Sequence, residues 1–318
     1  MNSLIIPVYR NEQSIPELLD TLRNLSRTVE ALEVVFVVDG SPDNSYQLLR
    51  EAAPLLPFKT QLIAHSRNFG SFAGIRTGLI AARGERFATM AADLQEPIEL
   101  AEECFRQLTN DEADVLIATR DARADPTFSR VSSSAFWWLY RRLINADIPP
   151  GGVDVFACNR KFRDQLVTLE EHNSSLIGLL FWMGFRRKTV SYVRKARQHG
   201  KSAWTFRRKL KYMVDSVFAF SDLPIRLLLG VGLVGLLVAT VLGLIVVASR
   251  LHGGVAVPGY TATIITILFF GGLNAFGLGL IGTYLWRAFA NTQHRPLSIV
   301  MSTEVFDGTK EQLESPTQ

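Results

Sequence analysis

Two long apolar stretches without charge constrain this chain more than any other feature. Residues 227–248 and 261–286 contain no Asp, Glu, Lys or Arg. As a helix rising 1.5 Å per residue, the first stretch spans about 33 Å, enough to cross a hydrocarbon core of about 30 Å. Buried helices of soluble domains rarely run so far without a charge. We therefore predict transmembrane helices over 225–249 and 261–286, joined as a hairpin by an external loop over 250–260.

The placement of Lys and Arg predicts how this hairpin is oriented. Eleven Lys and Arg residues and no Asp or Glu lie within 186–211, whereas the segment 249–260 holds only Arg250. Positive charge gathers on the cytoplasmic side of membrane proteins. We therefore expect a multi-pass protein of the cell inner membrane with cytoplasmic N- and C-termini and a cytoplasmic tail over 287–318. The N-terminus lacks the charged leader and cleavage site of a signal peptide.

The segment 206–224 is both basic and periodically apolar. Apolar residues recur at helical spacing from Phe206 to Phe218, with Arg207 and Arg208 among the cations between them. An anionic leaflet attracts such cations by about 1 kcal/mol each. We predict a juxtamembrane amphipathic helix lying on the cytoplasmic face. The alternative is a solvated helix that packs on the soluble domain.

The first 205 residues have the pattern of an α/β domain. Apolar strands are expected at 3–8, 32–38, 60–64, 87–91 and 114–118, and helices between them at 15–25, 45–53, 69–82 and 99–108. This alternation predicts a mostly parallel, doubly wound nucleotide-binding sheet. A content of 47% hydrophobic and 20% charged residues excludes a disordered chain. Two cysteines cannot form a disulfide framework, which favours a reducing compartment.

Polar clusters follow three of these strands, at 9–12, 39–43 and 93–96. In parallel sheets, ligands bind beyond the carboxyl ends of the strands. Each cluster alone also suits an ordinary turn or helix cap. A carboxylate beside a second oxygen ligand suits Mg²⁺ or Mn²⁺ bound to a diphosphate. Three clusters at successive strand ends favour a ligand site over three unrelated turns.

Four segments, 7–13, 38–43, 66–70 and 92–97, occur in the order found in family 2 glycosyltransferases. The chain more narrowly resembles the polyprenyl-phosphate glycosyltransferases, the group of the bactoprenol glucosyltransferases and dolichyl-phosphate mannose synthases. The resemblance covers residues 1–205 and implies a cytoplasmic catalytic domain with a GT-A-like sheet. It also implies an inverting transfer of a hexose, glucose from UDP-glucose, onto undecaprenyl or a related polyprenyl phosphate at the cytoplasmic face.

The resemblance also implies roles for individual residues. In the family, the segments matched by Pro7, Tyr9, Glu12 and Asp39 hold the nucleotide. Arg10 is a one-residue insertion in this pattern, and Ala91 stands where many relatives carry the first Asp of an Asp-x-Asp metal motif. The metal, Mg²⁺ or Mn²⁺, would then be held by Asp93 and Gln95. The residues matched to catalytic roles are Asp93, Asp154, Arg130, Ser134, Arg120 and Arg197.

A lipid phosphate as acceptor determines what the enzyme must supply for the reaction. A phosphate monoester is mostly dianionic at neutral pH, so it attacks the anomeric carbon without a strong general base. The enzyme must screen the repulsion between the donor and acceptor phosphates and align them. Arginines should therefore matter as much as acidic residues. Asp154 is assigned to positioning or proton handling. His65, His172, His199 and His294 lack metal-ligand spacing and are expected to be incidental, and the aromatic run 136–140 suits either core or a second interfacial helix.

Small residues recur at every fourth position in both apolar stretches, which permits close helix contact within the hairpin or between protomers. We expect a homo-oligomer, with a tetramer as the specific hypothesis, and no nucleic-acid partner. Two alternatives remain at this stage: the same reaction with GDP-mannose or a UDP-aminoarabinose-type donor, or a catalytically silent membrane scaffold. A processive synthase is disfavoured, since no Gln-x-x-Arg-Trp motif is present. The small residues are Gly235, Ala239, Gly243, Gly271, Ala275, Gly279 and Thr283.

Overall fold

The computed structural model describes residues 1–120, 137–149, 152–153, 155–171, 174–195, 206–251 and 260–308. The chain forms two compact units. The first contains residues 1–171, 176–208 and the chain from 295 onward, and the second contains 172–175 and 209–294. Each unit is described by itself.

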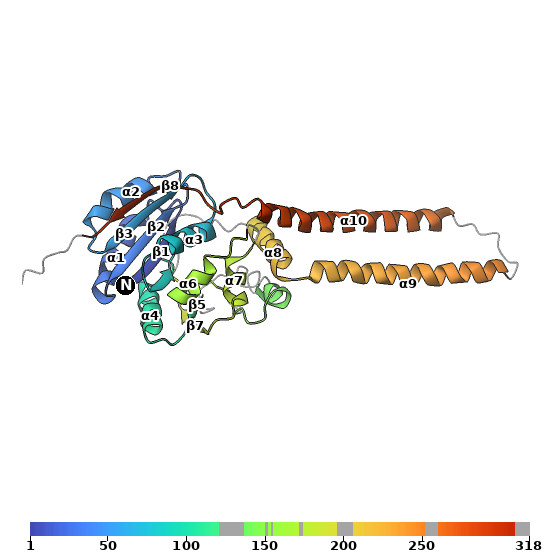
Figure 1. Ribbon diagram of the computed structural model, residues 1–318, viewed down its shortest axis with the longest axis horizontal. Helices are drawn as coiled ribbons and strands as arrows, with labels where there is room; N and C mark the ends of the chain where they lie inside the picture. The colour runs from blue at the N-terminus through green and yellow to red at the C-terminus, as the bar shows by residue number, and fades with distance from the viewer. Residues whose placement is uncertain are drawn as a thin grey trace, which may run out of the picture. The chain divides into compact units, whose positions relative to one another are not determined.

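An eight-stranded sheet in the order β7-β5-β6-β4-β1-β2-β3-β8 forms the centre of the first unit (Figure 1). Strands β1, β2, β3, β4, β5 and β7 run in one direction, whereas β6 and β8 are antiparallel to their neighbours. The mostly parallel sheet predicted from the sequence is therefore confirmed. The strands are β1 Asn2–Val8, β2 Leu32–Val38, β3 Lys59–His65, β4 Arg86–Thr89, β5 Val115–Arg120, β6 Val155–Asn159, β7 Arg187–Tyr192 and β8 Val300–Phe306.

Helices alternate with the first five strands, as the apolar spacing predicts. In α1 (Ile15–Thr28), the buried residues follow a spacing of three and four, and in β2 nearly every residue is apolar because both faces are covered. A further helical segment covers 137–143. The remaining helices of this unit are α2 Ser45–Ala52, η1 Ala53–Leu55, α3 Ser71–Ala81, α4 Ile98–Thr109, α6 Arg160–Leu166 and α7 Leu176–Trp182.

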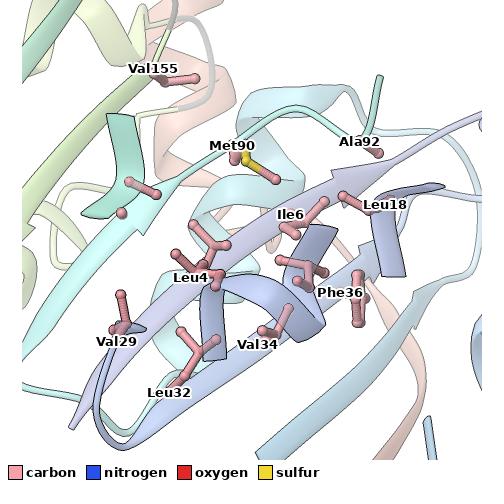
Figure 2. Close-up of a cluster of buried hydrophobic side chains, with 14 of the residues drawn as sticks. Leu4, Ile6, Leu18, Val29, Leu32, Val34, Phe36, Met90, Ala92 and Val155 are labelled. Carbon is pink, nitrogen blue, oxygen red and sulfur yellow. The ribbon is translucent and has the colours of Figure 1, made fainter. Parts of the chain in front are cut away.

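Alternate residues of the central strands point to opposite faces, so the sheet has a core on each side. Leu4 and Ile6 of β1 join the cluster formed with α1 and α4, much of which Figure 2 shows. Ile5 points to the other face, against α3. A Cβ on Gly78 of α3 would lie 2.3 Å from the Ile5 side chain, so glycine permits this close helix packing. The two cores fix the carboxyl ends of the strands relative to one another.

Strand β8 was not predicted. It pairs antiparallel with β3 at the edge of the sheet, from Thr60 opposite Phe306 to His65 opposite Val300. Glu304 accepts hydrogen bonds from the Tyr46 hydroxyl at 2.6 Å and from Arg50 Nε at 3.1 Å. Residues 300–306 therefore complete the sheet of the first unit, which differs from the predicted tail over 287–318 and from a predicted domain that stops at 205.

The described residues of the second unit form three helices, α8 Phe206–Phe220, of which residues 206–208 belong to the first unit, α9 Leu223–Leu251 and α10 Tyr260–Thr292. Leu223–Ile245 and Thr266–Thr292 are long and apolar enough to cross a membrane. None of the first apolar window and 6% of the second is buried, whereas a core helix of a soluble domain is mostly buried. The two helices run side by side (Figure 1).

The described contacts within this unit fix α8 to α10 and α9 to α10. Arg287 Nη2 lies 2.5 Å from Asp215 Oδ1, and its guanidinium lies 5.0 Å from the centre of the Phe218 ring. An ideal Cβ on Gly235 would lie 3.2 Å from the Phe270 ring. The other glycines of the small-residue pattern, Gly243, Gly271 and Gly279, have open space beside them.

Candidate active site at the carboxyl edge of the sheet

Six parallel strands end at the same edge of the sheet, and each is followed by polar residues. The segments after β1, β2, β3, β4 and β7 are 9–12, 39–43, 66–70, 90–96 and 193–195, and Arg120 ends β5. Arg130, Ser134, Asp154 and Arg197 lie outside the described residues. The sequence-predicted site residues that the structure places at or next to this edge are Pro7, Tyr9, Glu12, Asp39, Asp93, Gln95 and Arg120.

The loops after β1 and β2 are bound to each other. The backbone N–H of Arg10 donates to Ser41 Oγ at 2.8 Å, and that of Glu12 donates to Asp43 Oδ2 at 3.1 Å. In return, Glu12 Oε2 accepts the N–H of Asn44 at 3.0 Å. Arg10 has a φ of 55°, so the extra residue is absorbed as a left-handed turn. The left-handed turn at Arg10 is thus compatible with the contacts between the two loops.

The Asp43 carboxylate accepts several hydrogen bonds within this pair of loops. Its partial burial works to raise its pKa, but hydrogen bonds from the Ser41 and Ser45 hydroxyls and from the backbone N–H groups of Glu12 and Ser45 outweigh that effect. The pKa of Asp43 therefore lies below its ordinary value. The carboxylate is held in its charged form at the start of α2, where the helix dipole favours negative charge.

Asp39 is buried, and its carboxylate is hydrogen-bonded to other groups of the protein. Oδ1 accepts the backbone N–H of Phe69 at 2.8 Å and lies 2.8 Å from His65 Nδ1, while Oδ2 accepts the N–H of Gly70 at 2.7 Å. The side chain is 3% exposed. Asp39 thus fixes the loop 66–70 that follows β3, and a direct contact with a nucleotide stays a prediction.

His65, which was expected to be incidental, belongs to a buried hydrogen-bonded cluster. The ring is buried and bridges Asp39 to Thr77 Oγ1, which lies 2.9 Å from Nε2. The sequence offered one signal: His65 and Asp39 stand at the ends of consecutive apolar strands, and parallel pairing brings such ends together. Without the pairing of β2 with β3, that signal could not be separated from chance.

Gly40 allows the loop 66–70 to pass directly over β2's end. Gly40 has a φ of 57°, and a Cβ there would lie 2.3 Å from the backbone carbon of Arg67. An L side chain would therefore collide with backbone atoms and also strain its own backbone. The Gly in the Asp-Gly-Ser motif is required by close packing of two loops.

The segment after β4 is bound to the segment after β7. Gln95 Oε1 accepts a hydrogen bond from Arg194 Nη2 at 2.5 Å, and Gln95 and Lys195 are joined by a backbone hydrogen bond of 2.9 Å. Asp93 Oδ1 accepts the N–H of Gln95 at 3.3 Å. Arg194 is thus a cation of this edge that sequence reasoning missed, because no local pattern links it to Gln95.

The residues present fit a divalent cation in part. Asp93 is a half-buried carboxylate at a strand end, as Mg²⁺ sites that also use substrate phosphates and waters require. Gln95 as arranged is a poor ligand, because its carbonyl oxygen lies beside the Arg194 guanidinium, whose positive charge opposes a cation there. Among the described residues, no three His, Cys, Asp or Glu side chains gather as a metal site. Asp93 is therefore the one described protein ligand that we retain.

The aromatic run divides between core and surface. Trp137 is 9% exposed and Tyr140 is fully buried, whereas Trp138 is 67% exposed. Their spacing of three on the helical segment 137–143 places the first two on one face. The core interpretation thus holds for Trp137 and Tyr140, and Phe136 lies outside the described residues.

Comparison with known proteins decides the family. Residues 3–168, more than half of the chain, match glycosyl transferase family 2. The chain belongs to glycosyl transferase family 2. This protein is therefore a glycosyltransferase, and the resemblance stated from its motifs is confirmed. Its mostly parallel sheet with polar strand ends is the GT-A-like domain that the resemblance implied.

Relatives of this glycosyltransferase align over almost its full length. The uncharacterized glycosyltransferase YkcC of Bacillus subtilis (strain 168) is 32% identical over 95% of this chain and 93% of its own. The prophage bactoprenol glucosyl transferase homolog of Escherichia coli (strain K12) is 29% identical over 94% of this chain and 97% of its own. Among solved structures, glucosyl-3-phosphoglycerate synthase from Mycobacterium tuberculosis covers 69% of this chain and 76% of its own with 17% identity and a TM-score of 0.48.

Proposed function

We propose that this glycosyltransferase moves a hexose, glucose from UDP-glucose, onto undecaprenyl phosphate or a related polyprenyl phosphate, with inversion at the anomeric carbon. One observation carries the proposal. The relative named a bactoprenol glucosyl transferase homolog aligns over 94% of the chain, so the likeness includes the apolar helices as well as the sheet. A lipid acceptor explains why a sugar-transfer domain is joined to two helices whose apolar side chains are exposed.

The donor nucleotide belongs at the ends of β1 and β2 in this proposal. Tyr9 is half-buried, and the Arg10 guanidinium lies 5.4 Å from its ring centre, which suits a base lying against the ring. Pro7 and Glu12 flank Tyr9. Asp39 acts through the loop 66–70, whose backbone it holds. Selectivity for the nucleotide base and for the sugar depends on the shape of the pocket and not on these motif residues.

The chemical step needs charge screening more than proton transfer. The dianionic acceptor phosphate is itself the nucleophile, and the donor diphosphate leaves with added negative charge. A divalent cation, Mg²⁺ or Mn²⁺, bound beside Asp93 would neutralise part of that charge. Arg120 stands at the same edge and aligns the phosphates as a fixed cation. Arg130, Ser134, Asp154 and Arg197 keep the catalytic roles that the resemblance implies.

The order of elements supports a cytoplasmic catalytic domain with both termini on its side. Strands β1 and β8 belong to one sheet, so the chain between them must cross a membrane an even number of times. A hairpin of α9 and α10 meets this condition. We place the protein in the inner membrane as a homo-oligomer, with a tetramer as the specific hypothesis. The open glycine faces in the hairpin support this hypothesis, and crosslinking in membranes that yields only monomer would contradict it.

Transfer by the purified full chain tests the reaction. We would offer radiolabelled UDP-glucose, UDP-galactose and GDP-mannose, each with undecaprenyl phosphate and with Mg²⁺, Mn²⁺ or EDTA. The expected result is metal-dependent label in the lipid phase from UDP-glucose. Lipid label from another donor would change the proposed sugar but support the proposed type of reaction. No label in any lipid fraction would overturn the proposal.

A matched pair of carboxylate variants tests the site. Asp93→Asn keeps the shape of the side chain but removes its charge, and we expect transfer to fall at least about 100-fold. Glu99→Gln makes the same chemical change at an exposed position in the first turn of α4, and it should leave transfer within about twofold. Equal transfer by the two variants would show that Asp93 does not serve the reaction.

A further inference from the structure

A buried histidine stands between the donor edge and the end of the chain. His65 ends β3 and is 2% exposed. Its Nδ1 lies 2.8 Å from Asp39 Oδ1, and its Nε2 lies 2.9 Å from Thr77 Oγ1. Thr77 Oγ1 lies in turn 2.8 Å from Ser298 Oγ, in the segment that leads from α10 into β8. Four side chains thus form one continuous hydrogen-bonded chain.

The chemistry of the four groups gives this chain a direction. An ionised carboxylate only accepts, so the Nδ1–H of His65 donates to Asp39. With the ring neutral, Nε2 then accepts, and the Thr77 hydroxyl must donate to it. The oxygen of Thr77 is left to accept the hydroxyl proton of Ser298. Each donor has a single acceptor, so the orientation of the imidazole is fixed from both sides.

The loop 66–70 depends on the same groups. Phe69 and Gly70 donate their backbone N–H groups to the Asp39 carboxylate, at 2.8 and 2.7 Å. The N–H of Ser66 donates to the carbonyl of Ile299 at 3.0 Å. The His65 ring also meets the Phe69 ring edge-on, with centroids 5.6 Å apart. The loop is therefore held at one end by Asp39 and at the other by the returning chain.

We propose that His65 is a positioning residue of the donor site. It fixes the rotamer of the Asp39 carboxylate, and that carboxylate holds the loop 66–70 in the conformation that receives the nucleoside diphosphate. This inference rests on the proposed function, since it assigns the loop to the donor. Its consequence is that donor affinity depends on one particular hydrogen bond of His65, the bond from Nδ1 to Asp39.

Two substitutions separate the two bonds of the ring. The amide nitrogen of Asn reaches the position of Nδ1, and the amide oxygen of Gln reaches the position of Nε2, where it accepts the Thr77 hydroxyl proton. His65→Asn therefore keeps a donor to Asp39 and loses the contact with Thr77, whereas His65→Gln does the opposite. Both variants lose the ring and its packing against Phe69. A role in packing alone would affect the two variants equally.

The measurements are the dissociation constant for UDP by calorimetry and the thermal unfolding midpoint, both on the purified full chain. We expect His65→Gln to raise the dissociation constant about tenfold and His65→Asn to raise it less than about threefold, while their unfolding midpoints fall by similar amounts. His294→Gln changes an exposed histidine and should leave the constant unchanged. Equal weakening by the two His65 variants, or none by either, would overturn the assignment.

A milder pair covers the case in which His65→Gln does not fold. Thr77→Val removes the hydroxyl that orients Nε2 but keeps the side-chain shape, whereas Thr77→Ser keeps the hydroxyl. We expect Thr77→Val to weaken UDP binding about threefold and Thr77→Ser to retain it. Wild-type affinity in Thr77→Val would contradict the proposal. If the wild-type chain itself binds no UDP, the proposed donor is wrong and this inference falls with it, an outcome distinct from equal binding by all variants.

Discussion

Acidic side chains at the carboxyl edge of the sheet stabilise the loops there, in addition to the roles expected for them in the reaction. Asp39 holds the loop 66–70, and Glu12 and Asp43 bind the loops after β1 and β2 to each other. A substitution at any of them alters loop geometry before it alters chemistry. Loss of transfer in such a variant therefore needs an accompanying measurement of stability.

Asp43→Asn is expected to destabilise the protein in a pH-dependent way. The native pKa of Asp43 lies below the ordinary value of 3.8, so the unfolded chain binds the proton more readily. The stabilisation by the charged form is complete above that ordinary value and is lost as the pH falls through the lower native pKa. We expect the variant to cost about 1–2 kcal/mol at about pH 7.

Thermal unfolding of wild type and Asp43→Asn at several pH values measures this effect. The difference between the two unfolding midpoints should be full at about pH 7 and should shrink below about pH 4. Asp20→Asn, an exposed acid on α1, serves as the control and should show a small difference throughout. A difference for Asp43→Asn that is independent of pH would assign its effect to shape and not to charge.

The residues that gather at the edge were predictable, but their partners were not. Strand ends can be read from apolar runs, so Asp39 and Asp93 were placed correctly at one edge. Gln95 and Arg194 are 99 residues apart, and their contact depends on β5 and β7 pairing in parallel. No spacing in the sequence encodes that pairing.

At the scale of elements, local sequence predicted the strands and helices of the first 120 residues because the strands are short apolar runs and most of the helices have apolar residues at helical spacing. Strand β8 was not predicted from the sequence, and the reason is physical. Its residues alternate between exposed and half-buried, with Glu304 and Thr303 within it, so it lacks the continuous apolar run of β1 and β2. Edge strands need only one covered face, and that pattern is weak in a short segment.

Removal of β8 should destabilise the catalytic sheet. Truncation after Leu297 deletes the strand, the hydrogen bonds of Tyr46 and Arg50 to Glu304, and the Ser298 hydroxyl. Several backbone hydrogen bonds are lost at about 1 kcal/mol each, so we expect the unfolding midpoint to fall by at least about 5 °C. Truncation after Gly308 keeps β8 and is the matched control. An unchanged midpoint in the shorter chain would show that β8 adds no stability.

At the scale of the whole molecule, the sequence predicted two apolar helices and the sheet but not the return of the chain to that sheet. The hydropathy pattern shows where helices lie, and it is silent about which distant strands pair. The return nevertheless strengthens the predicted topology, since β1 and β8 must lie on one side of any membrane.

Cysteine labelling tests this topology. Leu251→Cys lies at the end of α9 and is 81% exposed, and Asp307→Cys follows β8. A membrane-impermeant maleimide should label the first variant in intact cells and the second only after permeabilisation. The native cysteines give little background, because both are buried and burial raises the pKa of Cys104 to about 12. Equal labelling of both variants in intact cells would contradict the proposed hairpin.

The late arrival of β8 has a consequence for biosynthesis. In the chain, 235 residues separate His65 from its partner Val300. At about 5–20 residues per second, a ribosome needs about 12–47 s to supply that partner after β3 has emerged. During this interval β3 is an open edge, and the loop 66–70 lacks one of its two anchors. The catalytic sheet is thus completed only after both apolar helices have been translated. If the loop 66–70 receives the donor as we propose, the donor site takes its final form only after the apolar helices have been made.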